Sequence, residues 1–144
     1  MIQVIIADDH PLVRFAVRSC LEWEESVEVV GEARTGKEAV DLTLRLQPDA
    51  VLLDYHMPVL DGIDAAKTIA DELPDVAILM LTAEDNPILE VEARRVGVRR
   101  LIRKDEPAEI LLRTLYQVLA EVRGETEDRL AIVIDTEQLP DRAT

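Results

Sequence analysis

The sequence contains few cysteine and aromatic residues. Cys20 is the single cysteine of the 144 residues, which excludes an internal disulfide framework and favours a reducing compartment. Aromatic residues account for only 3% of the chain and hydrophobic residues for 48%, so aliphatic side chains must fill the core. Two histidines, His10 and His56, have no companions at metal-ligand spacing, which argues against a zinc site.

Long apolar runs and an excess of basic residues are also missing. No apolar run approaches the ~20 residues that span a bilayer, and the first residues lack the basic start and cleavage site of a signal peptide. We therefore expect a soluble, cytoplasmic protein without a membrane partner. The net charge of −14, from 30 acidic and 16 basic residues, argues against direct DNA binding by this chain, because such binding needs basic residues to neutralise phosphates.

Short apolar runs alternate with stretches of helical period. Runs rich in Val, Ile and Leu predict strands that are buried on both faces: Val4–Ala7, Val27–Val30, Ala50–Leu53, Val76–Leu81 and Val98–Ile102. Between and after them, apolar residues share helix faces, as do Leu12, Phe15, Ala16 and Cys20 in the first. The fourth stretch, Ile88–Val96, is the least clear, and we expect Cys20 and Trp23 to be core or partial core.

Five strand–helix units in series predict a parallel sheet with helices on both faces. In such sheets a ligand site lies at the carboxyl ends of the strands. Five polar residues fall at those ends: Asp8, Asp9, Asp54, Thr82 and Lys104. Each alone has another explanation, as a helix cap or turn for Asp9 and Thr82 and as a solvated charge for Lys104, but their joint position is much more specific.

The chemistry of this set suits a phosphate and a metal ion. Three converging carboxylates repel one another unless a cation lies among them, and few hard oxygen ligands suit Mg²⁺. An aspartate such as Asp54 can also act as a nucleophile and form an aspartyl phosphate. Lys104 offers a positive charge to a phosphoryl oxygen, and Thr82 offers a hydroxyl donor.

Four stretches of the chain resemble the response-regulator receiver family of two-component systems, over about residues 2–123. They occur in the family's order and near its spacing: Ile5-Ile6-Ala7-Asp8-Asp9-His10, Leu53-Asp54-Tyr55-His56-Met57-Pro58-Val59-Leu60-Asp61-Gly62, Leu81-Thr82-Ala83 and Ile102-Arg103-Lys104-Asp105. The resemblance implies an α/β, flavodoxin-like doubly wound fold with a five-stranded parallel sheet in the order 2-1-3-4-5 and five helices.

The resemblance also implies a function and roles for the site residues. Asp54 would be the phosphoacceptor, with Thr82 and Lys104 gripping the phosphoryl group. The Mg²⁺ ligands would be Asp8, Asp9, Asp54 and the backbone carbonyl of His56. The partner would be a sensor histidine kinase or a phosphotransfer protein, and the chain would be a signalling domain, not an enzyme. Two alternatives are a binding module that turns over no phosphate and a phosphatase with an aspartyl intermediate; the latter usually has a second acid at the position of His56.

Three positions bear on how the switch behaves. By the resemblance, the side chains of His56 and Glu84 flank the path of the attacking water and tune the lifetime of the phosphoryl group; the alternative is exposed side chains without effect. Many receivers have Tyr or Phe where this chain has Leu101, and that ring reports the switch by turning inward. We therefore expect the output face to change less, or differently, on phosphorylation.

Domain boundaries follow a shift in composition after Gly124. We assign residues 1–124 to a receiver domain and 125–144 to an acidic tail or linker without a helix-turn-helix DNA-binding domain. Asp-Asp-His-Pro-Leu-Val-Arg at 8–14 and Lys-Asp at 104–105 resemble receivers that precede such a domain, which makes transcription regulation one output; a free-standing receiver and a fragment both remain open.

The run Leu130–Ile134 could add a strand to a sheet edge in cis or in a neighbouring chain, extend the packing of the fifth helix, or begin a further domain.

A group of arginines stands out in this acidic chain. It lies in the predicted fourth helix and fifth strand and comprises Arg94, Arg95, Arg99, Arg100 and Arg103. The group is either a solvated charge run or a docking surface for an acidic partner, which includes the tail of a second copy in a homodimer.

Overall fold

The computed structural model describes residues 1–83 and 85–124. Glu84, the predicted tail and its run Leu130–Ile134 therefore lie outside the described residues. Strands and helices alternate in the order β1 (Ile2–Ala7), α1 (Pro11–Glu22), β2 (Val27–Ala33), α2 (Gly36–Leu46), β3 (Ala50–Asp54), α3 (Gly62–Glu72), β4 (Ala77–Thr82), α4 (Pro87–Val96), β5 (Arg100–Arg103) and α5 (Ala108–Arg123).

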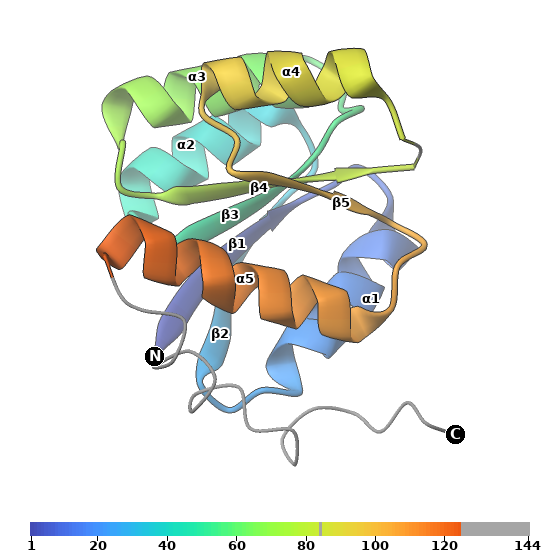
Figure 1. Ribbon diagram of the computed structural model, residues 1–144, viewed down its shortest axis with the longest axis vertical. Helices are drawn as coiled ribbons and strands as arrows, with labels where there is room; N and C mark the ends of the chain where they lie inside the picture. The colour runs from blue at the N-terminus through green and yellow to red at the C-terminus, as the bar shows by residue number, and fades with distance from the viewer. Residues whose placement is uncertain (84, 125–144) are drawn as a thin grey trace.

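The five strands form one parallel sheet in the order β2-β1-β3-β4-β5, which confirms the predicted fold class. Figure 1 shows α1 and α5 on one face of the sheet and α2, α3 and α4 on the other. Because successive side chains of a strand point to opposite faces, β1 contributes Val4 and Ile6 to one hydrophobic core and Ile5 and Ala7 to the other. Within the described residues no helix is both long and apolar enough to span a membrane.

The fifth strand begins two residues later than predicted. Val98 is buried, as expected of a strand residue, but its N–H bonds to the carbonyl of Ala93 and closes the end of α4. Gly97 makes this turn possible, since its φ of 114° is open to glycine and strained for other residues. Pairing with β4 then starts at Arg100, opposite Leu79.

The expected core face of α1 was wrong. Leu12 is 83% exposed, Phe15 is 70% exposed and Trp23 is 60% exposed, so only Cys20 is partial core as predicted. The inward stripe of the helix contains Leu21 and, seven residues earlier, Arg14, whose side chain is 11% exposed. Because Arg14 is polar, the apolar pattern of the sequence did not indicate that this stripe faces inward.

Candidate functional site

The carboxyl edge of the sheet brings the predicted site residues together. Asp54 and Thr82 are the last residues of β3 and β4, and Asp8 and Lys104 directly follow β1 and β5. One backbone hydrogen bond fixes each of Asp8 and Lys104. The Asp8 N–H donates to the carbonyl of Ala33, and the Lys104 N–H donates to the carbonyl of Thr82. In Figure 1 this edge is the one from which α1 and α5 begin.

Two buried carboxylates share one ammonium group. Asp8 is fully buried and Asp54 is 2% exposed. The Nζ atom of Lys104 lies 3.0 Å from Oδ1 of Asp54 and 3.1 Å from Oδ2 of Asp8. One lysine therefore partly neutralises two buried negative charges, and a negative charge remains in excess.

That excess appears in the pKa directions of the group. Burial raises the pKa of Asp54 above its ordinary value, as does the charge of Asp8, although the contact with Lys104 opposes the rise. For Lys104, burial acts to lower the pKa, but the hydrogen bond and charge of Asp54, together with Asp8, raise it overall. The pKa directions thus favour the charged form of Lys104 and disfavour the charged form of Asp54.

The remaining oxygens fit a divalent cation. Oδ2 of Asp8 and Oδ2 of Asp54 are buried and accept no hydrogen bond from the described residues, although the first of them is in ionic contact with Lys104. Ligand atoms of Asp8, Asp9, His10 and Asp54 all lie within 4.8 Å of one another. Carboxylate oxygens converging on one point are the ligands that Mg²⁺ prefers. A cation would relieve both the orphaned oxygens and the uncompensated charge.

Asp9 and His10 form the exposed side of this cluster. The Nδ1 atom of His10 lies 3.1 Å from Oδ1 of Asp8 and 3.0 Å from Oδ1 of Asp9. His10 is the N-cap residue of α1, but its side chain makes no capping bond. Asp9, for which a helix cap was the alternative expectation, is not the N-cap of α1, and its own carboxylate belongs to the cluster. The contacts of His10 with both aspartates were not predicted, because a histidine beside two aspartates has no distinctive spacing of its own.

The loop after β3 holds Asp54 by backbone contacts. The His56 N–H donates to Oδ1 of Asp54 at 3.4 Å, and the Tyr55 N–H donates to the carbonyl of Leu81. Gly62 starts α3 directly against the Asp54 carbonyl, where an added Cβ would collide with that oxygen. Val59 in the same loop has a φ of 72°, a strained conformation for a β-branched residue.

Thr82 lies on the other side of the site, 6% exposed. It is not a helix cap, since Asn86 caps α4. A cavity of about 120 Å³ is lined by Thr82 and Leu101 among others. Leu101 is partly buried against the core and is too short to fill this space in the way that an aromatic ring would.

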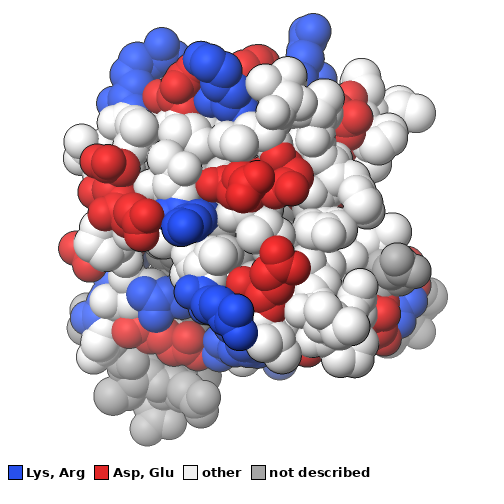
Figure 2. Space-filling view, turned by 90° about the horizontal axis from the view of Figure 1, so that it is seen from above, with Lys and Arg blue, Asp and Glu red and all other residues white. Residues whose placement is uncertain are grey.

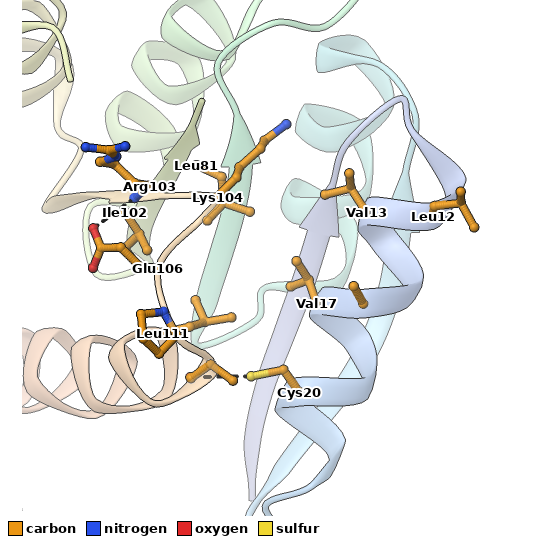
Figure 3. A pocket seen from close by; sticks show the side chains of 13 residues that line it. Leu12, Val13, Val17, Cys20, Leu81, Ile102, Arg103, Lys104, Glu106 and Leu111 are labelled. Atoms are coloured by element: carbon orange, nitrogen blue, oxygen red, sulfur yellow. Dashed lines mark hydrogen bonds between the residues drawn. The ribbon is translucent and has the colours of Figure 1, made fainter. Parts of the chain in front are cut away.

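An apolar groove of about 360 Å³ opens beside the site, between α1 and the segment that joins β5 to α5. Figure 3 shows Val13, Val17 and Cys20 of α1 on one side and Leu111 of α5 on the other. Lys104 lines the same groove, so the groove and the candidate site share a wall. The exposed side chains of Leu12 and Phe15 lie on the helix that borders it.

The five arginines are not equivalent. Three form ion pairs within the chain: Arg94 with Glu90, Arg100 with Glu121, and Arg103 with Asp85 and Asp105. Arg95 and Arg99 make no ion pair with the described residues. Figure 2, which looks onto the side of α2, α3 and α4, shows basic and acidic groups interspersed and not gathered into one basic patch.

One buried contact near the site was not expected from sequence. Arg14 donates from a guanidinium nitrogen to the backbone carbonyl of Asp8 at 2.7 Å, and its Nε lies 3.3 Å from Oε1 of Glu32 on β2. Arg14 is the last residue of the Asp-Asp-His-Pro-Leu-Val-Arg stretch, which in the sequence indicated only a resemblance to receivers that precede a DNA-binding domain.

A family model, the response regulator receiver domain, matches residues 4–116. The transcriptional regulatory protein LnrK of Bacillus subtilis is 37% identical over 118 residues, which are 82% of this chain and 54% of that protein. The transcriptional regulatory protein LiaR of the same organism is 39% identical over 115 residues, 76% of this chain and 53% of that protein. The chain thus spans about half the length of the curated relatives that it matches.

Solved structures agree with the sequence relatives. The signal receiver domain of the response regulator NarL from Mycobacterium tuberculosis superposes with a TM-score of 0.76 at 35% identity, covering 86% of this chain and 98% of that one. The response regulator domain of CheB from Thermotoga maritima has a TM-score of 0.78 at 29% identity, covering 83% and 96%. Both similarities extend over nearly the whole of the compared domain.

Proposed function

Since the chain belongs to the response-regulator receiver family of two-component systems, we propose that it is a switch that accepts a phosphoryl group on Asp54 with the help of Mg²⁺. The proposed donor is a sensor histidine kinase or a phosphotransfer protein. The observation that carries the proposal is the arrangement of Lys104 between Asp54 and Asp8, with Oδ2 of buried Asp54 accepting no hydrogen bond from the described residues.

The proposed reaction is a displacement at phosphorus. A carboxylate oxygen of Asp54 attacks the phosphorus atom of a phosphohistidine; the new O–P bond forms as the P–N bond breaks, and the electron pair of that bond stays on the imidazole nitrogen of the donor. Lys104 and Thr82 then hold the oxygens of the transferred group. Asp8, Asp9, Asp54 and the backbone carbonyl of His56 would hold Mg²⁺, which would supply positive charge to those oxygens.

The apolar groove supports a protein as phosphodonor. Its wall includes Lys104, so any macromolecule that delivers a phosphoryl group to Asp54 must approach this edge of the sheet. Leu12, which lines the groove, is 83% exposed, and Phe15 on the same helix is 70% exposed. Exposed apolar groups beside a reactive centre are typical of a docking surface. The kinase or phosphotransfer domain is the proposed occupant.

Signal output is proposed to follow a shift between two conformations of the receiver. We propose residues 1–124 as the receiver and 125–144 as a tail or linker, with transcription regulation or a change in dimerisation as the output. Arg95 and Arg99 are the arginines available for an acidic partner or a second copy. The role is a signalling one, exercised in the cytoplasm, in which the domain takes part in its own phosphorylation and dephosphorylation.

The experiment combines acetyl phosphate or beryllofluoride with Mg²⁺, followed by intact mass and size-exclusion chromatography. We expect the mass to increase by one phosphoryl group in the presence of acetyl phosphate and Mg²⁺, and not in Asp54→Ala. Asp71→Ala is the matched control, because Asp71 is an exposed aspartate on α3 outside the site. Modification that persists in Asp54→Ala, or that needs no divalent cation, would contradict the proposal. A size change that coincides with modification would identify dimerisation as the output.

A further inference from the structure

We propose that Arg14 is a positioning residue for the cation-binding loop, and that its contact with the backbone of Asp8 sets the affinity of the site for Mg²⁺. The inference rests on the proposed function, because it concerns the same carboxylates. It adds a residue of α1 whose side chain touches neither the phosphoacceptor nor a carboxylate of the site.

Asp8 is held from several directions. Its N–H donates to the carbonyl of Ala33 at 3.0 Å, and its Oδ1 accepts from the His10 N–H at 2.9 Å. Its carbonyl accepts from Arg14 at 2.7 Å. The backbone of Asp8 is thus fixed on both sides of the Cα atom, by β2 through Ala33 and by α1 through Arg14, and its side chain is directed toward Asp54 and Lys104.

A second contact holds Arg14 itself in place. Its Nε lies 3.3 Å from Oε1 of Glu32, and the side chain is only 11% exposed. Arg18, one turn further along α1, forms an ion pair with the other oxygen of Glu32. Arg14 therefore connects three segments, namely α1, β2 and the loop after β1. Groups that orient metal ligands without touching the metal typically change its affinity by roughly 10- to 100-fold when they are removed.

Charge and position predict opposite effects of removing this arginine. A positive charge near a cation site disfavours binding of the cation, so loss of the charge alone would tighten Mg²⁺ binding. Loss of the hydrogen bond to the Asp8 carbonyl would free the loop and weaken binding. The sign of the change in affinity therefore separates a positioning role from a purely electrostatic one.

The test compares Arg14→Ala with Arg18→Ala, its matched control. Arg18 lies on the same helix and pairs with the same Glu32, but has no contact with Asp8. The Mg²⁺ affinity of each variant is measured with MgCl₂ by NMR, from the shifts of the amides of residues 8–10. Phosphorylation by acetyl phosphate is then followed by intact mass across a range of Mg²⁺ concentrations. Arg14→Lys keeps the charge but cannot make both guanidinium contacts.

Support requires that Arg14→Ala weaken Mg²⁺ binding by roughly 10-fold or more, with Arg14→Lys in between and Arg18→Ala close to the unmodified chain. The phosphorylation rate at saturating Mg²⁺ should recover in Arg14→Ala, which a general loss of structure would not allow. Any one of three results would overturn this inference without affecting the proposed function. They are equal effects of Arg14→Ala and Arg18→Ala on Mg²⁺ affinity, tighter Mg²⁺ binding in Arg14→Ala, and a phosphorylation rate of Arg14→Ala that does not recover at saturating Mg²⁺. Absence of Mg²⁺-dependent modification in the unmodified chain would overturn the proposed function and this inference with it.

Discussion

The ammonium of Lys104 lies 3.0 Å from a carboxylate oxygen of Asp54, although strand β4 separates β3, which ends at Asp54, from β5, which ends just before Lys104. The contact bridges the carboxyl edge of the sheet over the end of β4. Because the same ammonium also contacts Asp8, it partly neutralises both buried carboxylates of the acidic site. In the proposed phosphorylated state it must turn to the phosphoryl group, so Lys104 serves two partners in sequence.

Replacing Lys104 with Met should make folding stability depend more strongly on Mg²⁺ than it does in the unmodified chain. Two buried carboxylates then lose their counterion, and breaking a buried pair in this way costs about 3–5 kcal/mol. Thermal unfolding without Mg²⁺ should show a lower Tm than for Lys67→Met, which removes an exposed lysine of α3. Added Mg²⁺ should restore most of the loss, while phosphorylation by acetyl phosphate stays slow. Equal Tm values for the two variants without Mg²⁺ would contradict this assignment.

Gly62→Ala should disturb the phosphoacceptor through the backbone. The new methyl group would collide with the carbonyl oxygen of Asp54, so α3 or the end of β3 must move. Overpacking of this kind costs about 1–3 kcal/mol, and we expect slower phosphorylation as well. Gly31→Ala is the control, because its methyl group would meet only side chains at 3.5 Å or more. Chemical denaturation and the acetyl phosphate reaction measure both effects; a Gly62→Ala variant as stable and reactive as Gly31→Ala would refute the prediction.

Glu24→Gln should stabilise the protein at neutral pH. The Glu24 residue is 3% exposed, and its Oε2 has no hydrogen-bond partner among the described residues. Burial, followed by the charge of Glu25, raises the pKa of Glu24 above its ordinary value of 4.5. The charged form is thus penalised in the folded state. That penalty is fully present above the raised pKa, and it disappears as the pH falls below 4.5, where the carboxyl is protonated in both states.

We therefore expect Glu24→Gln to gain about 1 kcal/mol at pH 7, with the gain vanishing in acid. Unfolding curves at several pH values measure this difference. Glu25→Gln, which removes the neighbouring exposed charge, is the control and should gain less. A gain in Glu24→Gln that is independent of pH would show that charge burial is not its cause.

Leu101 should weaken the usual coupling between Thr82 and the output face. The cavity of about 120 Å³ that these residues line has no aromatic ring to occupy it. Amide hydrogen exchange with and without beryllofluoride should show small or dispersed changes, and Leu101→Phe should enlarge the changes in α4 and β5. Large changes confined to α4 and β5 in the unmodified chain would count against this interpretation.

Charge reversal should separate the arginines that act between molecules from those that act within the chain. Arg95→Glu with Arg99→Glu removes two basic groups that have no ion pair with described residues, so folding stability should change by only about 0.5 kcal/mol. Self-association of the phosphorylated form should be lost, as measured by size-exclusion chromatography. Arg34→Glu, at an exposed position near the start of α2, is the control. Unchanged self-association in the double variant would indicate that Arg95 and Arg99 are solvated charges without a partner in another molecule.

The sheet and the main site residues could be predicted because both follow from local patterns. Buried strands such as Val51–Leu53 are apolar at every position, and parallel strands place their carboxyl ends at one edge whatever the details. Asp54 and Lys104 could therefore be assigned to one site from the sequence alone. The kind of ligand could also be predicted, since carboxylates and a lysine at one edge suit few ligands other than a cation and a phosphoryl group.

Other features depend on tertiary contacts that no local pattern records. Trp23 is apolar but exposed, and Glu24 beside it is charged but buried, because the end of α1 turns into β2 at that point. Arg14 sits on the inner stripe of α1 because its partners are a backbone carbonyl and Glu32, which is distant in sequence. The start of β5 was misplaced because Val98 bonds back to α4.

The placement of β1 at the interior of the sheet, between β2 and β3, has a consequence for how the chain is made. Within this domain Asp8 is synthesised with the first strand, yet its partner Lys104 follows only after β5. A nascent chain that stops short of β5 also lacks Lys104, so the buried carboxylates of Asp8 and Asp54 are without the ammonium that contacts both, and the sheet lacks an edge strand. The proposed phosphoacceptor site is therefore complete only after nearly the whole domain has been synthesised, and we expect incomplete chains not to accept a phosphoryl group.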